Sequence, residues 1–120
     1  MPRASELIAT AVRNFEREVP ALAKLKLVLR LELRGRGDVQ VYRVRVPGPE
    51  VSKGEPDDAR VEVTVSRSRF NELATQGKLR QWHEAYDHGD IKVAGDPEIR
   101  RLIATVIERQ EARSRLRKAH

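Results

Sequence analysis

Histidine is the residue type of this chain best suited to metal binding or proton transfer, because the sequence contains three histidines and no cysteine. His83 and His88 are five residues apart, a spacing that does not align them on one face of a helix. His120 is the last residue of the chain. The histidines therefore predict no metal site, and the lack of cysteine excludes disulfides and thiol chemistry.

Two pairs of aspartates could act as acids or as ligands, namely Asp57-Asp58 and Asp87 with Asp90. Each pair stands beside proline or glycine, where aspartate commonly shapes turns. The pair of glycines at Gly35 and Gly37 lacks the third glycine and the following helix of a phosphate-binding loop. A catalytic site needs a nucleophile, a base and an orienting group that converge, and spacing assembles none here. We expect no enzymatic activity and no cofactor.

The middle of the chain predicts a strand followed by a helix. Valines alternate with polar residues over 61–65, which is the period of a half-buried strand. Ser66 is placed to cap a helix that begins at the next residue. Gly77 is expected to end this helix in the left-handed conformation. The apolar stripe of the helix consists of Phe70, Leu73 and Ala74.

A second short helix, another strand and a third helix follow. Helical spacing of apolar residues begins after Lys78, and Gly89 is expected to close that helix. Ile91 and Val93 predict a short strand. Asp96-Pro97 is a helix start, because aspartate can cap and proline fits the first helical position. The stripe of the short helix contains Leu79, Trp82, Ala85 and Tyr86.

These elements, in this order, resemble the sterol carrier protein 2-like (SCP2-like) lipid-binding domain. The family pattern is a strand, a helix ending in Gly-Lys, a second helix, and a Gly-x-Ile-x-Val-x-Gly-Asp segment that leads into a last helix. The matching positions in this sequence are Phe70, Leu73, Gly77-Lys78, Gly89, Ile91, Val93 and Gly95-Asp96. The resemblance implies an apolar tunnel between helices and sheet that holds a sterol, a fatty-acyl chain or a similar lipid.

The first half of the chain fits the same order. An amphipathic helix over residues 7–19 ends near Pro20, and leucines alternate with mostly charged residues over 25–33 to predict a long strand. The returning strand changes phase near Val41-Tyr42, which predicts a bulge. A third strand around Val51 is expected to be short, because prolines and glycines surround it.

The last predicted helix has a clear apolar stripe that fades after Gln110. The stripe consists of Ile99, Leu102, Ile103, Val106 and Ile107. Residues 110–120 are strongly basic and are expected to form a frayed or solvated tail. The N-terminal segment MPRASELIATAV is charged and helical, so we expect neither a signal peptide nor a membrane span, and a cytoplasmic location.

The predicted architecture is one SCP2-like domain over residues 1–120. A chain of 120 residues buries roughly two thirds of its unfolded surface on folding, which suits one domain. The fold class is α+β, with an antiparallel-rich sheet of about five strands and helices packed on one face. An under-paired sheet edge near Val51 makes a homodimer conceivable.

Apolar positions on the core faces of these elements are the candidate ligand-binding residues. If the core encloses a tunnel, they would line it, with Trp82 near its mouth in the family arrangement. Leucine, valine and isoleucine at ordinary packing density would close the gap instead, and the domain would then be an accessory scaffold or protein-interaction module. The candidates are Leu27, Leu29, Leu31, Val63, Phe70, Leu73, Trp82, Ile91, Val93, Leu102 and Val106.

The formal net charge of +6, carried mainly by arginine, indicates which kinds of partner the surface could attract. A basic surface is attracted both to anionic lipid headgroups and to nucleic-acid phosphates. No RNA-binding or zinc-finger signature is present and aromatic residues are scarce, so nucleic acid is the less expected partner. The sequence therefore predicts non-catalytic binding or transfer of an apolar small molecule, with a peripheral anionic membrane as a second contact.

Overall fold

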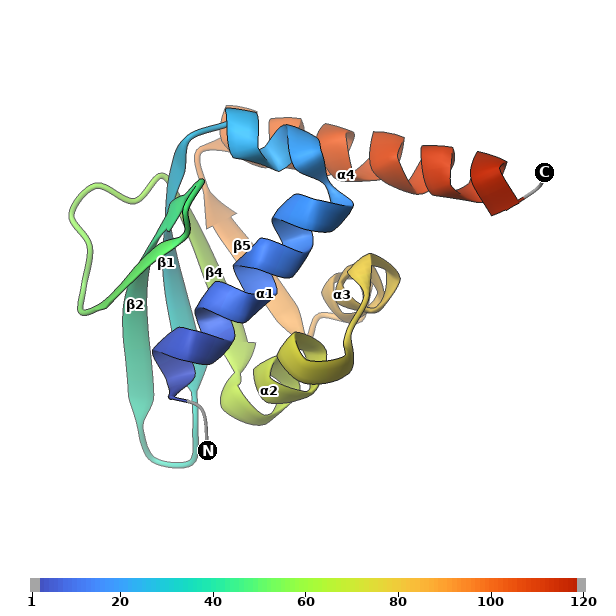
Figure 1. Cartoon of the computed structure of the whole chain (residues 1–120). Helices are drawn as coiled ribbons and strands as arrows, with labels where there is room; N and C mark the ends of the chain where they lie inside the picture. Colours follow the sequence, from blue (N-terminus) through green and yellow to red (C-terminus); the bar gives the residue numbers. More distant parts are fainter. Residues whose placement is uncertain (1–2, 119–120) are drawn as a thin grey trace.

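The computed structural model of the chain describes residues 3–118, which form a five-stranded sheet and the helices that pack against it (Figure 1). The sequence signals place most of the elements where the structure has them. In chain order they are α1 (Ala4–Glu18), the 3-10 helix η1 (Pro20–Lys24), β1 (Leu27–Arg34), β2 (Val39–Val46), β3 (Glu50–Lys53), β4 (Val61–Ser66), α2 (Arg67–Gln76), α3 (Leu79–Asp87), β5 (Ile91–Gly95) and α4 (Pro97–Lys118).

The sheet is mixed, with the strand order β3-β2-β1-β4-β5. The pairs β1–β2, β2–β3 and β4–β5 are antiparallel, so the predicted antiparallel-rich α+β class holds. The central pair β1–β4 is parallel, with Leu31 beside Val63. Sequence periodicity carries no information on strand direction, and the parallel pair could not be predicted.

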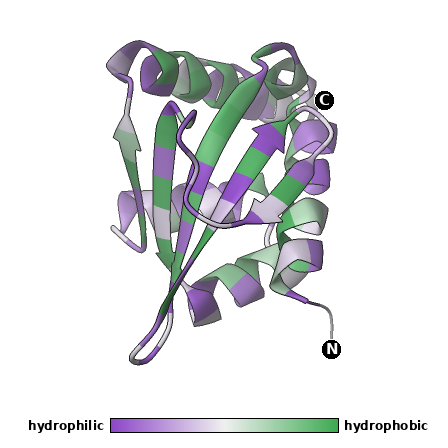
Figure 2. Ribbon diagram, turned by 90° about the vertical axis from the view of Figure 1, so that its left-hand side faces the viewer, coloured by the Kyte–Doolittle hydropathy of each residue, from purple (hydrophilic) through white to green (hydrophobic). Residues whose placement is uncertain are grey.

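Alternation along the strands separates a core face from an outer face, visible in Figure 2 as alternating bands of green and purple. Leu31 and Leu33 of β1 are buried on the face that the helices cover. Arg30, Glu32 and Arg34 alternate with them and form hydrogen bonds among themselves on the other face. The helices therefore meet a continuous apolar surface.

The connection from β3 to β4 runs along the outer face, where arginines of the sheet hold it. Arg43 donates to Asp58, with an Nη2–Oδ2 distance of 2.7 Å, and this hydrogen bond lowers the pKa of the Asp58 carboxyl. Arg30 pairs with Glu55, whose hydrogen bond is the main reason that the pKa of Arg30 is raised. These contacts lie at the surface and mainly position the loop. They leave the opposite face of the sheet to the helices.

The predicted bulge in β2 is wrong. The pairing of β1 with β2 is continuous, with Val41 opposite Glu32 and Tyr42 opposite Leu31. Val39 is 54% exposed and lies at the end of the strand, outside the core. Valine favours strands because of its branched side chain, even at positions that face water. The shift in the valine pattern therefore comes from valines on both faces of the strand and not from an extra residue.

The two glycines that end α2 and α3 work in different ways. Gly89 has a φ of +82°, the left-handed conformation that the sequence predicts. Gly77 has a φ of −77° and a ψ of 137°, so the prediction of a left-handed Gly77 is wrong. A Cβ atom at Gly77 would lie 2.5 Å from the carbonyl oxygen of Leu73. Glycine is needed at residue 77 for close approach of the backbone.

The predicted helix starts at Ser66 and Asp96 are confirmed. Ser66 Oγ accepts a hydrogen bond of 3.2 Å from the Arg69 N–H. Asp96 Oδ1 accepts one of 2.9 Å from the Glu98 N–H, and Arg60 donates to Asp96 Oδ2 at 2.6 Å. The hydrogen bond from Arg60, followed by that from the Glu98 backbone, lowers the pKa of Asp96. Asp96 thus fixes the start of α4 and ties it to the loop before β4.

Helix α4 continues to Lys118 and reaches beyond the rest of the molecule (Figure 1). Residues 113–116 are exposed, and Leu116 is 64% exposed. Residues 113–116 of the expected tail are therefore a solvated extension of the helix, whereas residues 110–112 are half-buried. None of the helices described in the structure is both long and apolar enough to span a membrane.

Candidate ligand-binding cavity

A cavity of about 580 Å³ lies between the helices and the core face of the sheet. Small-molecule sites in proteins typically measure ~300–1,000 Å³, and an apolar cavity of ~150 Å³ can already hold benzene. The cavity is therefore large enough for a lipid-sized group. It is a gap that the leucine, valine and isoleucine side chains of the core leave unfilled.

The floor of the cavity is made by the sheet. Because side chains alternate between the two faces of a strand, every second residue of the central strands points toward the helices. The parallel pairing of β1 with β4 places their apolar residues side by side. The strand residues of the lining are Leu27, Leu29, Leu31, Val44, Val46, Val61, Val63, Val65, Ile91 and Val93.

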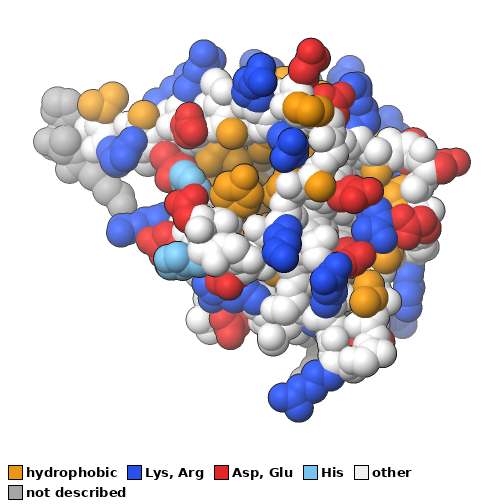
Figure 3. All heavy atoms as spheres, turned by 180° about the vertical axis from the view of Figure 1, so that it is seen from behind, with side chains coloured by type: hydrophobic (Ala, Val, Ile, Leu, Met, Phe, Trp, Pro, Cys, Tyr) orange, Lys and Arg blue, Asp and Glu red, His pale blue; other side chains and the backbone are white. Residues whose placement is uncertain are grey.

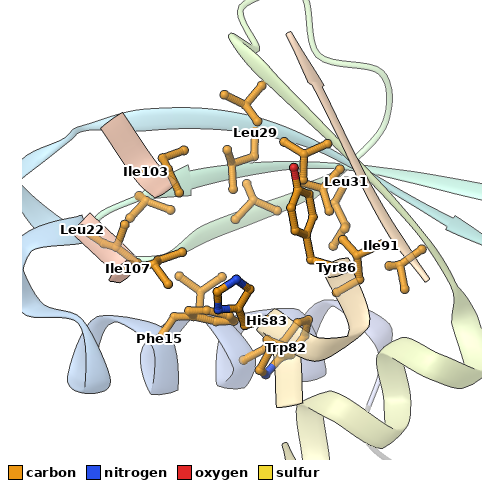
Figure 4. A pocket seen from close by; sticks show the side chains of 18 of the residues that line it. Phe15, Leu22, Leu29, Leu31, Trp82, His83, Tyr86, Ile91, Ile103 and Ile107 are labelled. Atoms are coloured by element: carbon orange, nitrogen blue, oxygen red, sulfur yellow. The ribbon is translucent and has the colours of Figure 1, made fainter. Parts of the chain in front are cut away.

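Helix α1 forms one wall, and an aromatic cluster joins it to α2 and α3. The rings of Phe15 and Trp82 meet edge to face with centroids 5.0 Å apart, and those of Phe70 and Trp82 do so at 5.9 Å. Trp82 is thus held between two helices while it lines the cavity (Figure 4). The residues of α1 in the wall are Ile8, Ala11, Val12, Phe15 and Glu16, at helical spacing.

Helix α4 contributes Ile103, Ala104 and Ile107 to the wall (Figure 4). Leu102 and Val106, which the sequence analysis predicted in the lining, are not part of it. At about 100° per residue, the lining residues 100, 103, 104, 107 and 108 share one side of the helix, whereas Leu102 and Val106 fall on the remaining side. Leu102 is 44% exposed. The stripe of α4 is wider than the part that meets the cavity.

Leu73 is also absent from the lining, because α2 buries it to 3% exposure within the packed core. The other predicted positions do line the cavity, and whether they bind a ligand stays a prediction. They are Leu27, Leu29, Leu31, Val63, Phe70, Trp82, Ile91 and Val93.

Several lining residues were not named from the sequence, although their periodicity was visible. The stripe of α1 was assigned to the core alone, and Tyr86 to ordinary helix packing. Leu22 of η1 carried no signal, because η1 is a 3-10 turn outside any periodic pattern. Periodicity shows which side of an element is apolar, but it does not show whether that side meets a neighbour or a gap.

The cavity is open to the surface. Figure 3 shows an apolar hollow on the face opposite to that of Figure 1, with charged side chains and a histidine around it. His83 Nδ1 lies 2.6 Å from Glu111 Oε1, and His83 Nε2 lies 3.7 Å from Asp87 Oδ1. Glu16 Oε1 is buried and has no hydrogen-bond partner among the described residues. The polar lining residues are Glu16, His83, Tyr86, Asp87, Arg100 and Glu108.

The arrangement is suited to holding an apolar group. Within residues 3–118, no three histidine, aspartate or glutamate side chains are grouped so that they could hold a metal ion. The imidazole of His83 is engaged by Glu111 at the rim, and the cavity floor carries only hydrocarbon side chains. The chemistry available on the floor is burial of hydrocarbon, while the polar groups of the lining come from the helices of the wall.

No protein-family model and no curated protein sequence matches this chain. Solved structures do match. Palmitated SCP2L2 from Aedes aegypti has 21% sequence identity and a TM-score of 0.58, with 83% of this chain and 93% of that chain covered. The apo form of sterol carrier protein 2 from Yarrowia lipolytica has 20% identity and a TM-score of 0.54, with coverages of 78% and 87%.

A further match is sterol carrier protein 2 from Aedes aegypti in complex with palmitate. It has 18% identity and a TM-score of 0.57, with 89% of this chain and 96% of that chain covered. At this level of identity the matches show the fold. The chain has the SCP2-like fold, as the strand, helix and glycine pattern of its second half predicted.

Proposed function

We propose that this SCP2-like domain binds a lipid or another apolar small molecule in the cavity between helices and sheet, and that it carries the molecule without transforming it. The observation that carries the proposal is the open apolar cavity of about 580 Å³. Two of the matching structures, palmitated SCP2L2 and the palmitate complex of sterol carrier protein 2 from Aedes aegypti, contain palmitate, which supports an acyl chain as one class of ligand.

The mechanism is partition of hydrocarbon from water into the cavity. Each buried methylene contributes about 0.8 kcal/mol, so an acyl chain of moderate length gains several kcal/mol. Part of that gain is offset by the entropy of immobilising the ligand. The apolar floor contributes affinity for hydrocarbon without selecting one particular tail structure.

The alternative of a closed scaffold with a filled core is less well supported. A filled core would leave no cavity of this size, because protein interiors are close-packed. Binding through the basic surface is compatible with the cavity and forms the second part of the proposal. The net charge of +6 holds the domain near anionic headgroups, where a lipid is exchanged.

The test is ligand binding by a variant whose cavity is filled from opposite walls. Val63 and Ile103 lie on the floor and on α4, and the double variant Val63→Phe/Ile103→Trp reduces the space between them. Leu102→Trp is the matched control, because it adds an indole to the same helix outside the cavity. Native mass spectrometry of the freshly purified proteins, followed by extraction, identifies any ligand that accompanies them.

Thermal unfolding with added sterols, fatty acids, acyl-CoAs, long-chain amines and isoprenoids completes the test. A ligand at 100 times its Kd stabilises a protein by about 2.7 kcal/mol. We expect such a shift for the unmodified chain and the Leu102→Trp control, and its loss in the filled variant. Absence of both an adduct and a shift across all five ligand classes would refute the proposal.

A further inference from the structure

The exposed residues of the cavity lining show where the cavity opens. The lining residues on the strands, on α1, α2 and η1 are all buried or half-buried. Those that are exposed come only from the end of α3 and from α4, namely Tyr86, Asp87, Arg100, Ala104 and Glu108. Figure 4 shows Tyr86 on the opposite side of the cavity from Ile103 and Ile107 of α4. The mouth of the cavity therefore lies between α3 and α4.

Helix α4 is packed less firmly than the other α-helices of the wall. Helices α1, α2 and α3 each have at least two buried side chains. In α4, no residue from 97 to 116 is buried, and none belongs to the hydrophobic core cluster or to the side chains packed against it. Segments that bury few apolar side chains open locally at a low free-energy cost. Of these helices, α4 is the one that can move away while the rest of the core stays intact.

The hydrogen bonds of α4 to other elements are few and lie in two places. At its start, Asp96 accepts a hydrogen bond from Arg60, and Arg100 donates to the backbone oxygen of Val93 at 3.5 Å. Beyond Arg100, the described side chains of α4 form one hydrogen bond with another element, in which Glu111 Oε1 lies 2.6 Å from His83 Nδ1. Because His83 lies on α3 and lines the cavity, this bond spans the mouth.

We propose that α4 is a lid, that the ligand enters and leaves between α3 and α4, and that the His83–Glu111 hydrogen bond holds the lid closed. The inference rests on the proposed function, since it concerns access to the same cavity. The lid turns about its fixed start at Asp96. Breaking the bond accelerates entry and exit alike, because both require the same movement. The affinity for the tail is set by the apolar floor, which stays in place.

A thiol on the cavity floor tests the lid without any ligand. The chain contains no cysteine, so Val63→Cys supplies a single thiol on β4 within the lining. Glu111 lies outside the lining, so Glu111→Ala removes the bond and leaves the cavity walls unchanged. We expect N-(1-pyrenyl)maleimide to modify the thiol about tenfold or more faster in the Glu111→Ala background, as for loss of a hydrogen bond to a charged group.

Glu98→Ala is the matched control for the thiol measurement. It removes a carboxylate from the fixed end of the same helix, outside the lining, and should leave the rate of modification unchanged. The acceleration in Glu111→Ala should also persist without change at low urea, because opening of one helix exposes little surface. A rate that rises steeply with urea would show global unfolding and would overturn the lid.

A covalent connection across the mouth gives the opposite effect. His83→Cys/Glu111→Cys replaces the hydrogen bond by two thiols that a short bifunctional maleimide joins. Release of palmitate to excess phosphatidylcholine vesicles is followed by the fluorescence of Trp82, the single tryptophan, which lines the cavity. We expect joining to slow release by about tenfold or more. Arg80→Cys/Glu84→Cys, joined by the same reagent one turn apart on α3, is the control and should release palmitate at an unchanged rate.

The outcomes separate this inference from the proposed function. If Glu111→Ala and Glu98→Ala give the same rate of thiol modification, or if joining α3 to α4 leaves release unchanged, the lid is refuted while lipid binding stands. If neither palmitate nor any other lipid binds, the proposed function fails, and the thiol measurement alone decides on the lid. Faster modification in Glu111→Ala together with slower release after joining supports the lid.

Discussion

Gly95 and Gly54 share an unusual backbone conformation but differ in their surroundings. Their φ angles are +117° and +130°, values that side chains with a Cβ rarely adopt. A Cβ at Gly95 would lie 2.4 Å from the carbonyl oxygen of Arg60, whereas a Cβ at Gly54 would meet nothing within 4 Å. Gly95 ends β5 where it pairs with Val61, so the close approach belongs to the sheet itself.

This pair allows backbone strain to be measured apart from steric contact. We expect Gly54→Ala to lower the free energy of unfolding by about 1–2 kcal/mol, the cost of a strained conformation. Gly95→Ala should cost about 1–3 kcal/mol more, because the backbone of Arg60 must also move. Urea denaturation of the two variants measures the difference, and equal losses would contradict it.

Some single-residue roles were accessible from the sequence and others were not. Capping by Ser66 and Asp96 follows from residue type and position alone, and the structure confirms both. The conformation predicted for Gly77 was wrong, because glycine can be required at the end of a helix for two reasons: a positive φ, or a close approach of the backbone to a neighbouring atom. The Glu16 Oε1 atom, which is buried and has no partner among the described residues, had no sequence signal, because its surroundings depend on tertiary packing.

At the scale of elements, the second half of α4 depends on few attachments. Its start is fixed by Asp96, while a hydrogen bond between Glu111 and His83 of α3 connects its later turns to the body of the molecule. The two side chains are 36% and 25% exposed, so the bond is only partly shielded from water. The bond therefore holds α4 beside α3 at the rim of the cavity.

Glu111→Ala should loosen the C-terminal turns of α4. Loss of a hydrogen bond that includes a charged group costs about 1.5–3 kcal/mol, so we expect amide hydrogen exchange over residues 108–116 to accelerate by tenfold or more. Exchange in the first turns, near Asp96, should not change. Glu108→Ala is the control, because the structure gives no hydrogen bond to that side chain in the described residues. Equal acceleration in the two variants would show that the bond to His83 does not hold the helix.

The sequence predicts the helices and strands themselves better than it predicts how they pair and pack. Local patterns suffice for a strand at 61–65 or a helix after Asp96, and the resemblance supplied their order. The direction of β1 relative to β4, the regular pairing of β2 and the choice of Ile103 over Leu102 for the cavity wall are set by tertiary packing. Whether a core is filled is likewise a property of facing surfaces.

At the scale of the whole molecule, basic groups gather on the exposed turns of α4. Arg113 and Arg115 lie there near the exposed Leu116, far from the turn between β1 and β2 in Figure 1. A phosphatidylserine surface attracts each such arginine by about 1 kcal/mol at moderate salt. The extension of α4 is therefore suited to an anionic membrane, as the proposed function requires.

We expect the protein to sediment with phosphatidylserine vesicles, to do so less with phosphatidylcholine, and to be released by salt. Arg113→Gln/Arg115→Gln should weaken the association by about tenfold to thirtyfold. Arg34→Gln/Arg36→Gln removes the same charge at the turn between β1 and β2 and is the matched control. If both double variants lose the same affinity, net charge and not α4 determines the attraction.

The parallel pairing at the centre of the sheet also governs the order in which the chain can fold. β1 and β2 are joined by a short turn and pair locally, whereas Leu29 must wait for Val61 to reach the other edge of β1. Non-local parallel pairing is slow, because a long loop is closed before any contact forms. During synthesis, when the N-terminal part emerges first, β1 therefore keeps one edge unpaired until residues beyond 66 have left the ribosome. β1, which later contributes to the floor of the cavity, is thus open to misassembly in the nascent chain during that interval.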